Sequence, residues 1–525
     1  MDSANTDSLS AAWRALPEGL KTKLRLGFTG KSHLLDIAGW CLRSGNLALN
    51  PIANNAIETA VRENPLDGAM AAELLALAPI RTLLNPDIVT RLTSLSTNWR
   101  IPADLEDYRH HLATRDFAAI KTYITQAVAD DPDNLYWMEQ ATTIGCIDND
   151  IEFCTESLNK NTANGVEKNI SDTETTVTAL FTPQATPKAQ ALMNAVAATP
   201  WNIHLALRAY DTLKGICNKR AALPGTTAIL LYSWNKAAEL DATLASLLES
   251  DLGNASIFVL NNGSTDGTAD MLDKWSERFA SELGAARFTV ITLPVNIGAA
   301  AARNWLMHLE AVQTHDFICY LDDDVELPVD WLPRLGAAVD EYPEAGVWGC
   351  KVVDHANTVL MQSADTHLLA APEPTMDLGR AAPNPFRLSD LHIQTLDSGL
   401  FDFMRPCASV TGCCHLFRTT TLLESGDFAL QLSPSQYDDM EHDLRLCEAE
   451  LFPVYQGHLT VHHKKRSGAA SRTSMQEEGN ALGNKYKMQT MHEAGDIAAA
   501  MQAEQQLLEG DILRKLAFLD EWGTA

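Results

Sequence analysis

The sequence predicts an α/β domain with a mostly parallel sheet flanked by helices, preceded by an all-α domain. From residue 226 onward, short apolar runs alternate with amphipathic segments, which is typical of βαβ units. Before this point the chain is rich in Leu and Ala and has few β-branched runs, which favours helices. A chain of 525 residues is also too long for one ordinary domain. We therefore expect a helical domain at 1–220, an α/β domain at 221–470 and a helical tail at 471–525.

A faint repeat runs through the helical region. Pro65, Pro132 and Pro200 lie 67 and 68 residues apart, and an Ala-Val pair that marks the end of a helix precedes each. Each proline is expected to start the next helix. The spacing is about twice the 34-residue period of tetratricopeptide helix pairs, although the full consensus of that repeat is absent. We favour a divergent tetratricopeptide-like solenoid over the alternative, a plain helical bundle. Residues 159–186, rich in Asn and Thr, are expected to form a loop.

The strands of the α/β domain are expected where apolar runs are short and continuous. Four such runs, each followed by a helix, lie at 226–234, 256–262, 288–295 and 317–321. A further strand at 346–353 follows a helix that starts near Trp331. Residues 355–400, rich in Pro and Asp, are expected to form an insertion, and strand character returns at 409–417.

Three adjacent carboxylates, Asp322, Asp323 and Asp324, end the fourth predicted strand. They repel one another and resist desolvation, so a fold gains nothing from them there. A divalent cation changes this balance, because Mg²⁺ or Mn²⁺ prefers oxygen ligands and often bridges carboxylates to a substrate phosphate. In open α/β sheets, ligands bind beyond the carboxyl ends of the strands. The pattern favours a metal site; the alternative is a solvated acidic turn.

Bulk composition excludes several classes of function. A net charge of −28 disfavours nucleic acid or an anionic membrane as a partner. The N-terminal segment lacks the basic and apolar regions of a signal peptide, and no run of about eighteen apolar residues predicts a membrane span. Ten cysteines without a C-x-x-C pair indicate neither a zinc site nor a disulfide framework. We therefore expect a cytoplasmic protein.

Seven short blocks in the α/β region resemble the motifs of family 2 glycosyltransferases, in the order that this family has them. The region in which they lie, residues 226 to about 470, is just under half of the chain, and together the blocks are highly specific. The blocks are LLYSWN at 230–235, NNGSTDGT at 261–268, NIGAAAARN at 296–304, LDDDVELP at 321–328, VTGCC at 410–414, YDDMEHDLR at 437–445 and VHH at 461–463. The resemblance implies the nucleotide-binding fold called GT-A.

The resemblance also implies a divalent cation, Mn²⁺ or Mg²⁺, and a nucleotide-diphosphate sugar as the donor. Asp324 is expected to bind the metal directly, with Asp322 assisting or holding the ribose or sugar and Asp323 near the donor. His462 lies where related enzymes often have a further metal ligand, and His463 is the second choice. The metal would neutralise the charge that gathers on the leaving diphosphate.

Three further residues are expected to contact the donor. By resemblance, Asn235 ends the first block and Asn261 occupies the position whose side chain meets the nucleotide base. Gly298 and four alanines let a helix start lie close to a ligand, where Arg303 would supply a fixed cation. The alternative for Arg303 is a surface salt bridge.

The acceptor hydroxyl needs a general base, since an alcohol is a poor nucleophile at neutral pH. The family has an acidic pair, a further acid two residues on and then an Arg. Here these are Asp438-Asp439, Glu441 and Arg445, so Asp439 matches the base. The alternative is a helix N-terminus enriched in acids that suit the helix dipole. By resemblance, the transfer would invert the anomeric centre.

The sequence therefore predicts a metal-dependent glycosyltransferase whose acceptor is a glycan, peptide or protein presented by the helical region. The alternative is a non-catalytic scaffold built from a decayed transferase domain and a helical interaction array.

The chain departs from the family pattern at two positions. Lys236 replaces the acid that many relatives have after Asn235. Asn261 replaces the Asp that contacts the nucleotide base in many relatives, and because an amide can both donate and accept, the sequence does not identify the base. The basic run Lys464-Lys465-Arg466 is either a loop that closes over the diphosphate or a solvated charge run.

Overall fold

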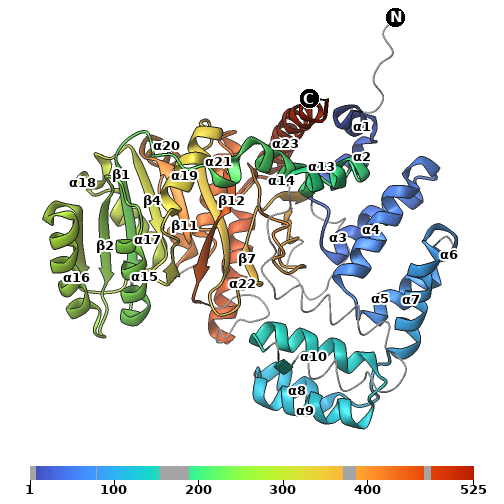
Figure 1. Cartoon of the computed structure of the whole chain (residues 1–525). Helices are drawn as coiled ribbons and strands as arrows, with labels where there is room; N and C mark the ends of the chain where they lie inside the picture. Colours follow the sequence, from blue (N-terminus) through green and yellow to red (C-terminus); the bar gives the residue numbers. More distant parts are fainter. Residues whose placement is uncertain are drawn as a thin grey trace, which may run out of the picture.

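The computed structural model describes residues 8–77, 80–150, 152–153, 189–370, 386–434, 436–465 and 475–524. The loop expected at 159–186 lies outside these residues. Figure 1 shows a sheet with helices on both faces, and a curved row of helices from α3 to α10 beside it.

The helical region confirms the predicted all-α character of the first part of the chain. Two single turns of 3₁₀ helix, η1 (Leu47–Leu49) and η3 (Ile216–Asn218), accompany the α-helices. The α-helices are α1 (Leu9–Ala15), α2 (Glu18–Leu24), α3 (Lys31–Arg43), α4 (Asn50–Glu63), α5 (Gly68–Ala76), α6 (Ile80–Leu83), α7 (Pro86–Asn98), α8 (Glu106–Thr114), α9 (Phe117–Asp130), α10 (Leu135–Asp148), α13 (Ala189–Ala198) and α14 (Ile203–Lys214).

The three prolines of the repeat lie in three equivalent turns between helices. The sequence suggested that each proline starts the next helix, but the helices start three residues later, at Gly68, Leu135 and Ile203. Two residues after each proline, a side-chain oxygen caps the following helix, because Asp and Asn satisfy the free N–H groups of a helix start better than proline does. The acceptors are Asp67 (2.8 Å from Met70 N), Asn134 (3.1 Å from Tyr136 N) and Asn202 (3.3 Å from Leu205 N). The tetratricopeptide-like solenoid itself stays a prediction.

The first half of the sheet consists of four parallel strands, as predicted. β1 (Thr227–Ser233) lies between β2 (Ser256–Asn262) and β4 (Phe317–Leu321), and β3 (Phe288–Leu293) pairs with β2. These bounds lie within two residues of the predicted ones. The connecting helices are α15 (Ala237–Glu249), α16 (Thr268–Leu283), α17 (Ala299–Met307) and α18 (Glu310–Gln313), with η4 (Ala285–Arg287).

The second half of the sheet is mixed. β11 (Cys414–Arg418) runs antiparallel to both β4 and β6 (Val347–Asp354), and β12 (Val454–His463) runs parallel to β6. The strand predicted at 409–417 starts at Cys414: Ser409 forms an isolated antiparallel bridge with Thr366, and the N–H of Val410 donates to the Asp443 side chain. The other elements are β5 (Val325–Glu326), α19 (Trp331–Glu341), β7 (Met361–Ser363), β8 (Leu368–Ala370), β9 (Phe386–Leu388), β10 (Met404–Pro406), α20 (Thr419–Ser425), η5 (Leu430–Leu432) and α21 (Asp438–Glu448).

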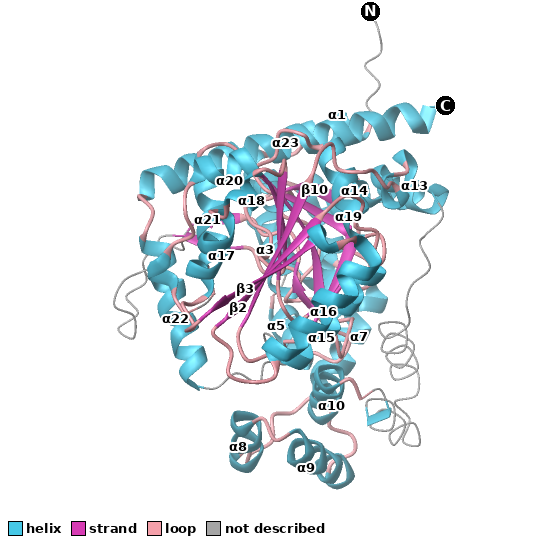
Figure 2. Cartoon of the chain, turned by 90° about the vertical axis from the view of Figure 1, so that its left-hand side faces the viewer, coloured by secondary structure: helices cyan, strands magenta, loops and turns pink. Residues whose placement is uncertain are grey.

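The described part of the C-terminal tail is helical, as predicted, and packs on both parts of the chain. It forms α22 (Met475–Thr490) and α23 (Ala494–Thr524), and α23 lies against α1, α14, α21 and β10. Figure 2 shows α23 beside α1 across one end of the sheet. Trp13 of α1 donates to Glu509 of α23 at 3.1 Å, and Leu9 N donates to Asp520 at 2.6 Å. Among the described residues, no helix combines the length and hydropathy needed to span a membrane.

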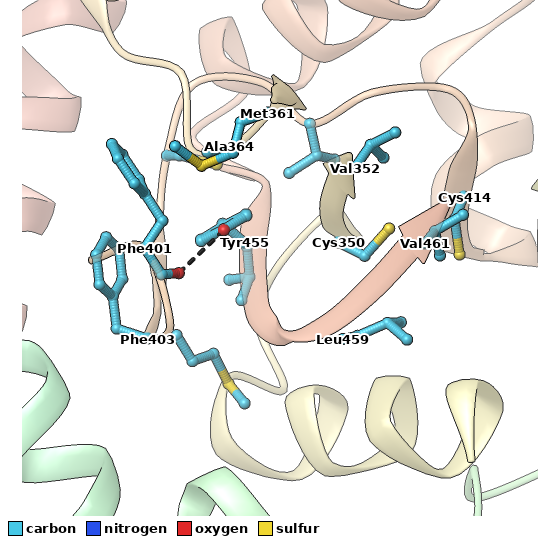
Figure 3. Packing of buried hydrophobic residues seen from close by; sticks show 14 of the residues in the cluster. Cys350, Val352, Met361, Ala364, Phe401, Phe403, Cys414, Tyr455, Leu459 and Val461 are labelled. Carbon is cyan, nitrogen blue, oxygen red and sulfur yellow. Dashed lines mark hydrogen bonds between the residues drawn. The ribbon is translucent and has the colours of Figure 1, made fainter. Parts of the chain in front are cut away.

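The core is continuous from the helical region into the sheet. Buried apolar side chains of α1–α5, α13 and α14 belong to one cluster with those of β1–β4, β6, β11 and β12. Figure 3 shows part of this cluster around β12, where the Tyr455 hydroxyl donates to Phe401 O at 3.0 Å. Arg405 fixes the α2–α3 connection to the sheet by donating to the carbonyls of Arg25 and Leu26, at 2.7 and 2.8 Å.

We predict that Asn134→Ala destabilises the chain by about 2–3 kcal/mol. The Asn134 side chain is buried, and besides capping α10 it bonds to both N and O of Arg100, at 2.9 Å each. The exposed cap Asn85 of α7 serves as control, and Asn85→Ala should cost about 1 kcal/mol or less. Thermal unfolding followed by circular dichroism measures both, and equal shifts would contradict the structural role given to this turn.

Candidate functional site

The carboxyl ends of the parallel strands β1, β2, β3 and β4 lie along one edge of the sheet, and polar residues end or follow several of them. Their register places Ser233 beside Asn261, Asn262 beside Leu293, and Leu231 beside Leu321. The loops that follow these strands therefore meet at this edge, where ligands bind in open α/β sheets. Asn235, Asn261 and the acidic triplet are brought together here, as the sequence predicts.

Asn235 and Asn261 brace the loop that follows β2. Asn235 adopts a left-handed backbone conformation (φ 54°), and its Oδ1 accepts from Thr265 N at 2.7 Å. Asn261 is buried, and its Oδ1 accepts from Ser264 N at 3.0 Å. Gly263 of this loop passes so close to the β3–α17 connection that a Cβ would lie 2.3 Å from Val295 C. Both Asn carbonyl oxygens therefore serve the loop itself.

The acidic triplet divides into one partly exposed and two buried carboxylates. Asp322 has a side chain 26% exposed, whereas Asp323 and Asp324 are buried. Lys236, whose Nζ lies 2.9 Å from an oxygen of each, bridges the two buried carboxylates. Burial would lower the pKa of Lys236, but its attraction to Asp323 and Asp324 outweighs this and raises the pKa above its usual range. Lys236 is thus the counter-ion of the two buried carboxylates of the triplet, Asp323 and Asp324.

His463, and not His462, faces the acidic triplet. His463 Nε2 lies 3.0 Å from Asp324 Oδ1 and 4.0 Å from Asp322 Oδ2, and Nδ1 lies 2.6 Å from Gln362 Oε1. Burial opposes the charged form of His463, but Asp324 outweighs it and raises the pKa of this histidine.

The prediction that His462 would join the cluster is corrected by strand geometry. Successive side chains of a strand point to opposite faces, so only one of two adjacent histidines can face the triplet. In β12, His463 pairs with Val325 and His462 with Glu326. The His462 ring lies 6.4 Å from that of His355, and burial lowers its pKa.

Cys413 joins Asp322 and His463, which the sequence analysis did not foresee. One ligand atom from each of the three residues lies within 4.8 Å of the others, and this is the group of metal-binding type found among the described residues. Cys413 directly precedes β11, and its carbonyl accepts from Asp322 N at 3.2 Å. The donor set of carboxylate, imidazole and thiol fits a divalent transition-metal ion.

Arg303 lies behind the triplet and is buried, with 4% of the residue exposed. Its Nη2 lies 3.9 Å from Asp322 Oδ1, and its Nε lies 3.6 Å from Asp438 Oδ2. Burial would lower the pKa of Arg303, but Tyr232 and the surrounding carboxylates raise it well above its usual range. Arg303 is therefore not a surface salt bridge. It links the acids after β4 with those that start α21.

Asp439 is half-buried at the start of α21, next to Arg303. Its Oδ2 accepts from Gly412 N at 2.7 Å. A Cβ on Gly412 would lie 2.5 Å from Arg303 Nη2 and 2.8 Å from Asp439 Oδ2, so only glycine allows this approach. Burial raises the pKa of the neighbouring Asp438. The next acid, Glu441, pairs with Arg445 at 3.1 Å.

The basic run at 464–466 is described only in part, because Arg466 lies outside the described residues. Lys464 N donates to Asp324 O at 2.9 Å, and Lys465 O accepts from Gln362 Nε2 at 2.9 Å. The backbone of this segment therefore touches the residues that hold His463 and the triplet.

We predict that Lys236→Met destabilises the chain and makes it more responsive to a divalent ion. Breaking a buried ion pair costs about 3–5 kcal/mol, and since the Lys236 side chain is 38% exposed we expect about 1–3 kcal/mol. Mn²⁺ should then raise the melting temperature of the variant more than that of the wild type, because the ion replaces the lost ammonium. Lys23→Met, which removes the partner of Asp36 far from the site, should leave the Mn²⁺ response unchanged. An equal Mn²⁺ shift in wild type and Lys236→Met would contradict a metal site at the triplet.

Comparison with known proteins gives a family match in the α/β part of the chain. Residues 228–410 match the family model described as Glycosyl transferase family 2. A search of curated proteins found no significant match.

Several solved structures show a low level of similarity to the chain. GalNAc-T7 with UDP, GalNAc and Mn²⁺ is 13% identical, with a TM-score of 0.36 over 47% of this chain and 44% of that chain. Mannosyltransferase PcManGT from Pyrobaculum calidifontis, in complex with GDP-Man and Mn²⁺, is 16% identical, with a TM-score of 0.35 over 63% and 85%. S. aureus TarS is 17% identical, with a TM-score of 0.31 over 46% and 36%. The chain thus spans less than half the length of GalNAc-T7 and of TarS.

These TM-scores carry no weight, so we rely on the family match and on the order of strands and motifs along the chain. Residues 228–410 are thus similar to glycosyl transferase family 2, and this part of the chain has the mostly parallel sheet with flanking helices that the sequence predicts.

Proposed function

We propose that this chain is a metal-dependent glycosyltransferase that moves a sugar from a nucleotide-diphosphate donor to an acceptor hydroxyl. One observation carries the proposal. A group of metal-binding type (Asp322, Cys413 and His463) and a carboxylate suited to general-base work (Asp439) flank the same buried guanidinium, that of Arg303. A transferase of this class needs a cation for the leaving diphosphate and a base for the acceptor, held a fixed distance apart.

The residues present fit a divalent ion, and Asp322 and His463 would hold it. When bound, the ion would act as a Lewis acid that stabilises charge on the leaving diphosphate. Asp324, expected from the resemblance to bind the ion directly, is bonded to Lys236 and His463. Because Asp324 bonds to His463 Nε2, the nitrogen that also faces Asp322, an ion bound there would meet both carboxylates, and Gln362, bonded to Nδ1, would orient the ring.

Trp234 is the residue best suited to hold the nucleotide base. It directly follows β1 at the ligand-binding edge, just before Asn235, and 50% of the residue is exposed. An exposed indole face stacks well on any base. The braced loop formed by Asn235, Asn261 and Gly263 would line the same region, and Asn261 leaves the base identity open.

Asp439 would accept the proton of the acceptor hydroxyl as that oxygen attacks the sugar carbon. The Gly412 N–H donates to Asp439 Oδ2 at 2.7 Å and fixes the orientation of this carboxylate. Arg303 is buried, with 4% of the residue exposed, and would act as a positioning residue for Asp322 and Asp439. A single displacement of this kind would invert the anomeric centre.

The helical region would present the acceptor, a peptide, protein or glycan. The three equivalent turns after Pro65, Pro132 and Pro200 support a tetratricopeptide-like array, and such arrays offer extended surfaces for peptides and proteins. On this view residues 1–220 recruit the acceptor, residues 221–470 carry the chemistry, and α23 in the 471–525 tail joins the two.

A non-catalytic scaffold is the second candidate, and one observation favours it. Lys236 and His463 already neutralise Asp323 and Asp324, so the acidic cluster is tolerated without any bound ion. A scaffold predicts that no nucleotide sugar is turned over by the wild-type chain.

We expect Asp439→Asn to reduce the rate of nucleoside-diphosphate release by about 10²–10⁴-fold, because the acceptor loses its base while donor binding is kept. A panel of nucleotide sugars with Mn²⁺ measures the rate, and thermal shift measures donor affinity for the same proteins. Asp273→Asn, an exposed acid on α16, should match the wild type. Unchanged turnover in Asp439→Asn would remove this residue from the mechanism, and absence of turnover in the wild type would favour the scaffold.

Trp234→Ala should raise the donor dissociation constant by about 5- to 100-fold, which corresponds to about 1–3 kcal/mol of base stacking. Trp305→Ala on α17 is the matched control, since that side chain is 48% exposed but follows no strand end. Calorimetric titration with the nucleoside diphosphate and Mn²⁺ gives both constants. Equal effects of the two substitutions would show that Trp234 has no special role.

A further inference from the structure

Cys413 is the one member of the Asp322–Cys413–His463 group that neither the acidic motif nor the adjacent histidines explain. Its thiol is buried, with 6% of the residue exposed, and lies in hydrogen-bonding contact with the Asp322 carboxylate and 3.5 Å from Thr411 Oγ1. The ligand atoms of all three residues lie within 4.8 Å of one another. A cation among them would meet one oxygen, one nitrogen and one sulfur.

The next residue, Cys414, points the other way. It begins β11 opposite Leu321, and its thiol lies in hydrogen-bonding contact with Cys319 and Cys350 in the apolar core. Figure 3 shows Cys414 and Cys350 within this core. Alternation along the chain thus separates the two neighbouring thiols, so that Cys413 faces the carboxylates and Cys414 faces the core.

We propose that Cys413 is a direct ligand of the bound ion and makes this site selective for thiophilic transition metals. The inference rests on the metal site of the proposed function and deepens it. On binding, the metal–sulfur bond replaces the S–H bond, and the thiol proton leaves to solvent. Thiolate and imidazole ligands favour Zn²⁺ and Co²⁺ over Mn²⁺, and Mg²⁺ least, because Mg²⁺ takes oxygen ligands.

This assignment separates two kinds of metal site. A site of carboxylates and water alone serves Mg²⁺ and Mn²⁺ about equally well, and its affinity does not depend on a thiol. A site with Cys413 binds Zn²⁺ and Co²⁺ much more tightly. The sulfur also leaves a spectroscopic mark on bound Co²⁺ that oxygen ligands do not.

The test compares the full-length wild type, Cys413→Ser and Cys414→Ser, each titrated with Co²⁺ in the absence of donor. The wild type and Cys414→Ser should show thiolate-to-cobalt charge-transfer absorption in the near ultraviolet, and Cys413→Ser should lack it. Affinity for Zn²⁺ should fall about tenfold or more in Cys413→Ser, while affinity for Mg²⁺ stays roughly the same. Charge-transfer absorption that persists in Cys413→Ser, or that is absent from the Co²⁺-loaded wild type, overturns the proposal.

Because Cys413 is buried, the fold of each variant is checked by its melting temperature in a chelator. Should Cys413→Ser not fold, zinc-edge X-ray absorption of Zn²⁺-loaded Cys414→Ser decides the question. A sulfur neighbour supports the assignment, and a shell of only nitrogen and oxygen overturns it.

Nucleoside-diphosphate release from the donor panel separates this inference from the proposed function. If the absorption depends on Cys413 but no donor is turned over with any ion, the ligand assignment stands and the transferase proposal fails. If donors are turned over with Mn²⁺ while the Co²⁺ spectra are the same in Cys413→Ser and wild type, the transferase proposal stands and Cys413 is no ligand.

Discussion

The structure depends on how crowded carboxylates at one edge of the sheet are compensated. Five acids gather where β4 ends and α21 begins, and an uncompensated buried charge is strongly destabilising. Each compensating cation comes from a different element: Lys236 follows β1, Arg303 lies on α17 and His463 ends β12. The parallel order of β3, β2, β1 and β4 and the antiparallel insertion of β11 bring these elements to the same edge. The strand order of the sheet therefore determines which cations lie next to the crowded carboxylates.

A short chain of hydrogen bonds connects the helical region to this site. Asn149, after α10, donates to Ala356 O at 2.7 Å, and Asn357 donates to Cys146 O. In the same loop, His355 N donates to His463 O at 2.9 Å. The end of the helical row thus touches a loop that is bonded directly to the proposed metal ligand. This contact links the helical region physically to the proposed site.

Much of the fold and the centre of the site could be predicted from the sequence. The ends of β1, β2, β3 and β4 were predicted within two residues from apolar runs that end in polar residues, and the position of the triplet after β4 follows from the same pattern. The preference for His462 over His463 was wrong, because which of the two histidines faces the triplet depends on the register of β12 against β5. Cys413 was missed for a similar reason, since only the antiparallel pairing of β11 with β4 brings it beside Asp322. Lys236 was seen as a departure, but its role as a counter-ion needs the fold.

The central claim is that a divalent ion binds between Asp322 and His463 and holds the donor diphosphate. The most direct measurement is a crystal structure with Mn²⁺ and a nucleoside diphosphate, using the anomalous signal of manganese. The account predicts an anomalous peak about 2.2 Å from Asp322 and His463, in contact with a phosphate oxygen. An ordered nucleoside diphosphate with no such peak, or with manganese bound away from these two residues, would contradict it.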